Sequence, residues 1–185
     1  FYLAGITAWN YFADCITKTS TVFRDNATIF SKVYFPRIIM PLSIVISNLV
    51  RFGVQFLLLL GMLAYYVFVK HEVCYPSFFI ILFPVLILLM AILGLGMGML
   101  ISSMTTKYRD LAFLVSFGVQ LLMYTTTVVF PLSSVHASYR WIVSLNPMTS
   151  IIELFRFGIL GHGTYSSSGF LYSVIFAVAI LFAGI

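Results

Sequence analysis

The chain has 185 residues, of which 62% are hydrophobic and only 8% charged, and its formal net charge is +5. A soluble domain contains about 25% charged residues, so this composition excludes a water-soluble globular protein. It predicts an all-α, polytopic membrane protein, because an apolar chain crosses lipid as helices that satisfy their own backbone hydrogen bonds. The chain starts without a methionine and stops inside an apolar run, so we expect one transmembrane domain of a longer protein, truncated at both ends.

Five segments are candidate membrane-spanning helices, each of which needs about 20 mostly apolar residues. The first, 3–23, is the weakest, because polar residues such as Asp14 and Lys18 interrupt it. Its aromatic residues suit a membrane interface. The other four candidates are 38–69, 77–103, 111–130 and 169–185.

The basic residues predict the orientation, since cytoplasmic segments carry an excess of Lys and Arg. If 24–37 and 104–110 are cytoplasmic, that side holds six of the ten basic residues and the outer side three, with Arg51 inside a span. We therefore expect the N-terminal end of the chain outside. The cytoplasmic six are Lys18, Arg24, Lys32, Arg37, Lys107 and Arg109, and the outer three are Lys70, Arg140 and Arg156.

The segment 24–37 predicts a short helix at the cytoplasmic surface. Asp25 or Asn26 can cap it, and its apolar residues share one stripe. Pro36 ends this helix, and Pro41 falls in the first turn of the next one, where a missing N–H costs little. Two interpretations stay open: a helix resting on lipid headgroups, or a helix that docks into a groove of a cytoplasmic partner. The candidate docking residues are Asp25, Ile29, Phe30, Lys32, Val33, Tyr34 and Arg37.

Polar residues share one face of the span 38–69, at spacings of three and four. A charge inside the membrane is expensive and should face protein or water. Asp14 lies at similar depth in the first span and is the candidate partner of Arg51. Alternatively, Arg51 extends toward the interface, or both charges serve only helix packing. The polar face consists of Ser47, Asn48, Arg51 and Gln55.

The next span contains a small-xxx-small pair, Gly94 and Gly98, which allows another helix to approach closely. It ends in a short cytoplasmic turn, which Lys107, Arg109 and Asp110 would organise. Asp110 would also favour the start of the following helix through the helix dipole.

The segment 111–130 carries a stripe of aromatic and polar side chains at spacings of 4, 3, 4 and 3. Rings offer apolar contact and the polar groups offer hydrogen bonds, so the stripe suits a passage for sugars. Helix–helix packing is the alternative interpretation. The stripe consists of Phe113, Phe117, Gln120, Tyr124 and Thr127.

The apolar stretches within residues 131–168 are too short to form another membrane span. Pro131 should end the preceding helix, and Asn146-Pro147 predicts an N-cap followed by proline at the first helical position. We expect the helix that follows to rest on the outer interface or to dip into the membrane and return. Its apolar stripe is Met148, Ile151, Ile152, Phe155 and Ile159, and the other candidate residues of the segment are Arg140, Trp141, Asn146, Pro147, Glu153 and Arg156.

The sequence lacks the residue patterns that several kinds of binding and catalysis require. The sequence has no GxxxxGK[ST] phosphate loop, its three histidines are far apart, and its five acids form no local acid–base pair. Cys15 and Cys74 should both be free. We expect no catalytic residue, metal site or cofactor on this chain.

Five stretches, in this order, resemble the permease subunit of the type-2 ABC exporters, specifically the branch that exports polysaccharides. KYRD and SLNP followed by IIELFR are the most specific, because neither follows from hydrophobicity alone. The five stretches are GITAWNYF, KVYFPRIIMPLS, LISSMTTKYRDL, VVFPLSSV and YRWIVSLNPMTSIIELFR.

This resemblance implies six spans in the full subunit, a homodimer, and two copies of a separate ATPase that binds ATP and Mg²⁺. It implies that residues around 25–35 couple to the ATPase and that 139–160 form outer helices near the channel mouth. Trp9 and Phe12 of the first span would line the conduit together with the stripe of 111–130. The implied cargo is a lipid-linked glycan such as O-antigen, teichoic acid or capsule, moved across a bacterial cytoplasmic (inner) membrane.

Two other functions stay open. A type-2 ABC exporter of drugs or small lipids would share the architecture. A passive channel or an integral-membrane lipid-processing enzyme belongs to another class and would have no ATPase partner.

Overall fold

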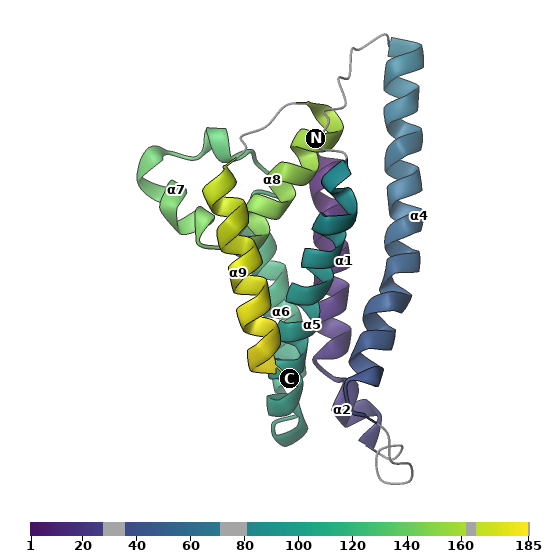
Figure 1. The fold of residues 1–185 in the computed structure, drawn as a ribbon, viewed down its shortest axis with the longest axis vertical. Helices are drawn as coiled ribbons and strands as arrows, with labels where there is room; N and C mark the ends of the chain where they lie inside the picture. Colours follow the sequence, from purple (N-terminus) through teal and green to yellow (C-terminus); the bar gives the residue numbers. More distant parts are fainter. Residues whose placement is uncertain (28–35, 71–80, 162–165, 185) are drawn as a thin grey trace.

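The computed structural model describes residues 1–27, 36–70, 81–161 and 166–184. The elements in this part of the chain are helices (Figure 1). They are α1 (Tyr2–Thr19), α2 (Val22–Asp25), α4 (Ile39–Lys70), α5 (Phe83–Lys107), α6 (Leu111–Thr125), the 3₁₀ helix η2 (Leu132–Ser134), α7 (Ala137–Ser144), α8 (Pro147–Leu160) and α9 (Ser167–Gly184).

The helices α1 and α5 form the centre of the bundle. α1 packs against both α4 and α5, and α5 also packs against α9. The N-terminus, α7 and α8 lie at one end of the bundle, while α2 and the α5–α6 turn lie at the other (Figure 1). The described residues of the two segments predicted to be cytoplasmic, 24–37 and 104–110, therefore lie at the same end of the molecule.

Three described helices are long and apolar enough to cross a membrane: Ile39–Val69, Phe83–Lys107 and Ser167–Gly184. They correspond to three of the five predicted spans. α1 is interrupted by polar residues, as its sequence indicated, and α6 is only 15 residues long. The count of five spans stays a prediction.

The predicted end of the span 111–130 is wrong. α6 stops at Thr125, and Thr126 is extended, with φ −100° and ψ 157°. The helix does not run on to Pro131, because the carbonyls of Thr127 and Val128 point to another partner, the buried guanidinium of Arg156. Tertiary hydrogen bonds thus replace the last turn of the predicted helix.

Two glycines of α5 let α1 approach closely, as the small-xxx-small spacing predicted. A Cβ on Gly94 would lie 2.6 Å from the Cβ of Cys15, and one on Gly98 would lie 2.6 Å from the Cβ of Thr19. Real Cβ atoms do not approach this closely, so the α1–α5 contact depends on hydrogen at both positions.

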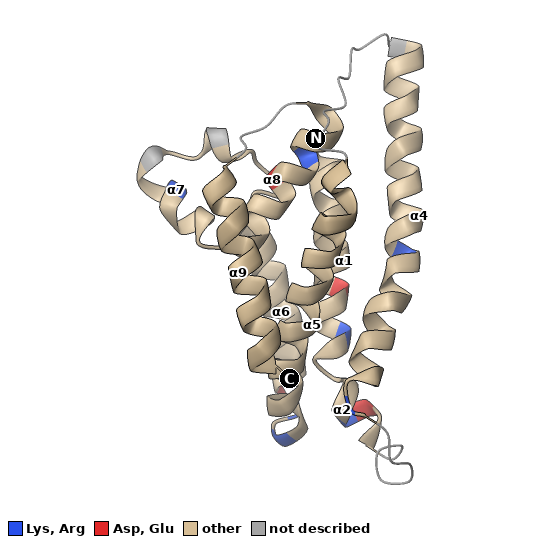
Figure 2. Cartoon of the chain, viewed as in Figure 1, with Lys and Arg blue, Asp and Glu red and all other residues tan. Residues whose placement is uncertain are grey.

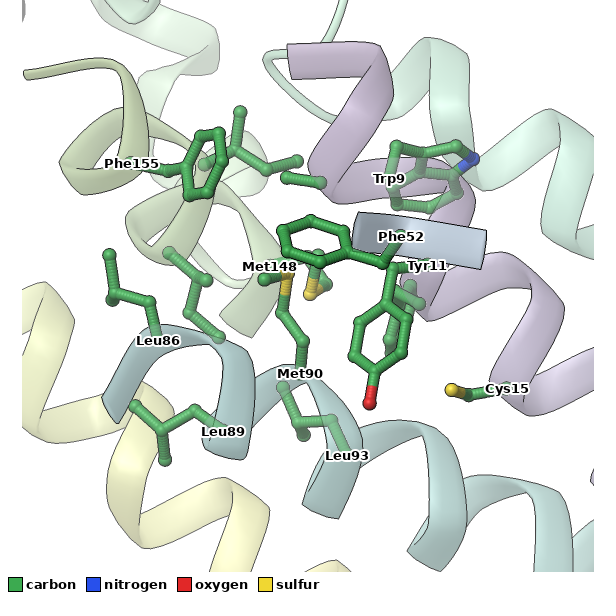
Figure 3. Packing of buried hydrophobic residues seen from close by; sticks show 14 of the residues in the cluster. Trp9, Tyr11, Cys15, Phe52, Leu86, Leu89, Met90, Leu93, Met148 and Phe155 are labelled. Carbon is green, nitrogen blue, oxygen red and sulfur yellow. The ribbon is translucent and has the colours of Figure 1, made fainter. Parts of the chain in front are cut away.

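The buried core fills the space between α1, α4, α5 and α8 (Figure 3). Phe155 of α8 lies at its centre, with its ring 4.7 Å from Phe83 and 6.4 Å from Phe52. The packing of α8 against α4 and α5 is therefore part of the buried core.

The environment of α8 differs from the one we expected. Its apolar stripe is buried, but so are Glu153, Leu154 and Arg156, which lie off that stripe. An isolated helix resting on the interface would expose one face, whereas α8 is covered by the rest of the chain, and its place at the outer interface stays a prediction. Asn146 does cap α8, accepting a hydrogen bond from the backbone N–H of Met148 at 3.0 Å, and Pro147 follows at the first position. Re-entry of this segment into the membrane stays a prediction.

The described charges gather mainly at the two ends of the bundle (Figure 2). Arg24 and Asp25 of α2 lie at the same end as the basic α5–α6 turn. Such a distribution fits a body whose middle is in hydrocarbon.

Candidate functional site

The aromatic face of α6 lies on the outside of the chain. Phe113 is 78% exposed and Phe117 60%, and Gln120 is exposed beside them. Val119 is the buried residue of this helix. Packing inside the chain therefore does not explain the stripe, and the face is open to lipid, to a substrate or to a second copy.

The other predicted conduit residues lie elsewhere. Trp9 and Phe12 are buried, with their rings edge to face at 5.4 Å. Thr127 follows the end of α6 and is buried too. The structure thus does not gather all the predicted conduit residues on one surface.

A cavity of about 560 Å³ opens beside them, between α1, α7, α9 and the end of α6. Trp9, Phe12 and Tyr124 contribute to its wall. None of its described lining residues is charged, and most are apolar.

Arg156 of α8 is fully buried. Its guanidinium donates to the carbonyl oxygens of Thr127 and Val128. Its Nη1 also lies 3.6 Å from Oε1 of Glu153, which accepts the N–H of Leu132 at 3.2 Å. These bonds fasten the segment after α6 to α8, which is a structural role rather than one at the exposed outer surface.

A polar seam joins α1 to α4. Nη1 of Arg51 lies 2.9 Å from Oδ2 of Asp14, so the predicted pair forms. One turn away, Nζ of Lys18 donates to Oδ1 of Asn48 at 2.6 Å, and Asn48 is buried. Of the predicted polar face, Ser47 is exposed and does not join the seam.

Residues 1–160 match the family described as "ABC-2 type transporter". The chain belongs to this family. It is 28% identical over 183 residues to an O-antigen export system permease protein RfbA of Klebsiella pneumoniae, covering 95% of this chain and 68% of the relative. A second RfbA of that species is 29% identical over 88% of this chain and 62% of the relative, and an RfbA of Myxococcus xanthus is 28% identical over 84% and 58%.

These comparisons confirm the resemblance to permeases of the polysaccharide-exporting branch. The matched part spans between 58% and 68% of the length of these relatives. As a member of the ABC-2 family it is a transport component and a multi-pass membrane protein.

The end of this ABC-2 domain that carries α2 is fastened to α5. Oγ1 of Thr105 donates to the carbonyl of Ser20, and the backbone N–H of Phe23 donates to Oγ of Ser102 at 3.4 Å. These bonds hold α2 and the residue Ser20 before it against α5.

Asp25 is the last residue of α2 and forms an ion pair with Arg24, whose Nε lies 2.9 Å from Oδ1 of Asp25. Burial raises the pKa of the Asp25 carboxyl, but hydrogen bonds from Thr21 and Arg24 outweigh burial and bring the pKa below its usual value. Asp25 is therefore ionised at neutral pH. Asn26 donates its side-chain amide to the carbonyl of Val22.

Most of the predicted coupling helix, Ile29, Phe30, Lys32, Val33 and Tyr34, lies outside the described residues, as does Cys74. Arg37 is described and exposed, and Pro41 lies in the first turn of α4 as predicted. In the α5–α6 turn, Lys107 and Arg109 are exposed and Asp110 is the N-cap residue of α6. Cys15 is free and buried.

The sequence reasoning missed the burial of Glu153 and Arg156. Their spacing of three on one helix was a usable signal, because opposite charges at i and i+3 can pair. The acceptors on Thr127 and Val128 could not be foreseen, since they are backbone groups of a segment predicted as helix. Among the described residues, no group of three or more His, Cys, Asp or Glu could hold a metal ion.

Proposed function

We propose that this chain is the membrane-spanning part of an ATP-driven exporter that moves a lipid-linked polysaccharide across a bacterial cytoplasmic membrane. The observation that carries the proposal is the similarity, across nearly the whole chain, to relatives named O-antigen export system permease proteins. The exposed aromatic face of α6 supports it, because a long glycan needs ring surfaces and hydrogen-bonding groups along its path.

The proposed assembly contains two copies of the permease and a separate ATPase that holds ATP and Mg²⁺. The ATPase would engage the end of the bundle that carries α2 and the α5–α6 turn, where Arg24, Arg37 and Lys107 supply exposed or half-exposed charge. Movement of α2 would pass to α5 through the bonds made by Ser102 and Thr105. This chain contributes no covalent chemistry.

The glycan would move along the face formed by Phe113, Phe117 and Gln120, with a second copy of the chain providing the opposite wall. The face is exposed in the single chain, and aromatic side chains give broad contact without binding one sugar unit tightly. Such a surface suits a repeating cargo that must slide.

The test is deletion of the full-length gene in the source organism, followed by measurement of surface glycan and of lipid-linked glycan inside the cell. We expect glycan to disappear from the surface and to accumulate inside on its lipid carrier. Expression of the intact gene should restore the surface glycan.

Normal surface glycan without internal accumulation would refute the proposal and favour an exporter of drugs or small lipids. Co-purification of the full-length permease then separates the remaining class. An ABC ATPase in the preparation fits any exporter of this family, whereas its absence would favour a channel or a lipid-processing enzyme.

A further inference from the structure

The cavity between α1, α7 and α9 leads from the surface into the core. Its floor contains Trp9 and Phe12, which are 2% and 3% exposed. Its mouth contains Tyr139 and Ile142, which are 63% and 49% exposed. A slender molecule at this surface can therefore approach the inner aromatic rings without unfolding any helix.

The chemistry of the lining selects hydrocarbon. The cavity volume of about 560 Å³ lies within the range of roughly 300–1,000 Å³ typical of small-molecule sites. None of the described lining residues is charged. Asn146, the amide in the wall, already donates to Thr126 at 2.7 Å and accepts from Met148 at 3.0 Å. A sugar would find few hydrogen-bond partners here, whereas an alkyl chain needs none.

The wall is built in advance. Where α7 meets α8, the carbonyl oxygens of Val143, Leu145 and Pro147 accept hydrogen bonds from Thr149, Tyr172 and Ser173, at 2.7, 3.0 and 2.7 Å respectively. These bonds tie the lining segment to α8 and α9. The cavity is thus a shaped recess rather than a gap between loosely placed helices, as expected of a preformed binding site.

We propose that this cavity binds one hydrocarbon chain of a membrane lipid, with the chain entering past Ile142 and ending against Trp9. An unfilled apolar recess loses van der Waals contacts along its lining, so a hydrocarbon chain that fills it stabilises it. The chain can come from a bulk phospholipid or from a polyprenyl phosphate carrier. This inference does not rest on glycan export, because chain binding requires neither ATPase nor glycan.

The experiment uses the full-length permease in lipid nanodiscs that contain either a diazirine-tagged phospholipid or a diazirine-tagged polyprenyl phosphate. After illumination, peptide mass spectrometry locates the label. We expect it in the segments 122–130 and 139–147, which line the cavity. Val143→Trp places a large ring in the cavity and should lower labelling there about tenfold, which corresponds to about 1.4 kcal/mol.

Ile175→Trp is the matched control, because Ile175 is 60% exposed on α9 and does not line the cavity. Ile142→Trp at the exposed mouth is a second blocking variant, which keeps the test valid if Val143→Trp misfolds. Size-exclusion chromatography checks that each variant is folded.

The two lipid probes separate the sources. Labelling of the cavity by the tagged polyprenyl phosphate alone assigns the site to the carrier, and equal labelling by the tagged phospholipid assigns it to bulk lipid; both outcomes support a hydrocarbon site. The proposal would be overturned if the segments 122–130 and 139–147 were labelled no more strongly than the lipid-facing side of α9. Labelling that neither Trp variant reduces would also overturn it.

Discussion

Arg156 connects segments that are far apart in sequence. It lies in α8, yet its guanidinium donates to the carbonyl of Thr127, 29 positions earlier, and it pairs with Glu153 at side-chain exposures of 0% and 4%. In a buried ion pair, each charge compensates the cost of burying the other. Removing one leaves the other buried without compensation.

Arg156→Met should therefore destabilise the full-length permease by about 3–5 kcal/mol. In this variant the carboxylate of Glu153 has lost its positively charged partner. The carbonyl groups of Thr127 and Val128 have also lost their hydrogen-bond donor. Thermal unfolding followed by size-exclusion chromatography measures the loss. Lys107→Met, at an exposed position, is the control and should change stability by no more than about 0.5 kcal/mol. Equal unfolding temperatures for the two variants would contradict this role of Arg156.

The pair of Asp14 and Arg51 lies in a different setting, because their side chains are 29% and 61% exposed. In water such a pair would contribute about 0–1 kcal/mol, but a charge left unpaired inside a membrane costs more. Asp14→Asn and Arg51→Gln should each lower stability, and the double variant should lose less than the sum. We expect a coupling of about 0.5–3 kcal/mol from the double-mutant cycle. Strict additivity would mean that the contact is incidental.

At the scale of the helices, α1 and α5 approach closely where α5 carries Gly94 and Gly98. Gly94→Ala and Gly98→Ala each place a methyl group 2.6 Å from a Cβ of α1, and overpacking of this kind costs about 1–3 kcal/mol. Gly53→Ala is the matched control, since a Cβ there would meet no atom within 4 Å and alanine favours a helix. The measurement is the unfolding temperature of the purified full-length permease. A control that is destabilised as much as Gly94→Ala would contradict the packing argument.

Local signals predicted the elements well where one short-range interaction decides the structure. The cap at Asn146, the proline after it and the glycines of α5 follow from rules that involve a few neighbouring residues. The end of α6 and the burial of α8 were not predictable in this way. Both depend on Arg156 and its distant carbonyl acceptors, and hydrophobic spacing carries no information about such a contact.

The stripe on α6 shows the same division. Spacing placed Phe113, Phe117 and Gln120 on one face, and the structure has all three exposed. Thr127 was assigned to that face because the helix was expected to continue, and it is buried instead. Trp9 and Phe12 were assigned to the conduit from the resemblance, and nothing in their spacing separated a conduit wall from the core that they join.

Phe113→Ala and Phe117→Ala should reduce export of the glycan without lowering stability. The side chains are 78% and 60% exposed, so their removal leaves no cavity in the chain, while each lost aromatic contact costs about 0.5–1.5 kcal/mol along the path. Surface glycan in the complemented deletion strain is the readout. Phe182→Ala on α9, where the ring is 77% exposed, is the control. If Phe182→Ala reduced export equally, the effect would belong to exposed aromatic residues in general.

At the scale of the whole molecule, several faces of the chain are apolar and uncovered. α4 exposes Leu57 and Leu58, both at 68%, α9 exposes Phe182, and α6 exposes its aromatic stripe. Lipid can cover all of them. The α6 face carries an amide, Gln120, among its rings, and an amide facing hydrocarbon costs free energy unless it is hydrogen-bonded. α4 also exposes a polar group, Arg51, but that side chain is paired with Asp14 of α1. The amide among the rings therefore favours α6 as the face that meets a second copy or a hydrated path.

A homodimer with two-fold symmetry brings the same surface of both copies together, so a residue near the axis approaches its own counterpart. In a full-length permease in which every native cysteine, Cys15 and Cys74 included, is replaced by alanine, we therefore expect Phe117→Cys to form covalent dimers with short bis-maleimide linkers. Leu57→Cys and Phe182→Cys are the controls, since both positions are exposed but lie on α4 and α9. Electrophoresis under denaturing conditions measures the cross-linked fraction. Efficient cross-linking through α4 or α9, with none through α6, would move the contact between copies to another face and remove the second copy as the opposite wall of the proposed glycan path.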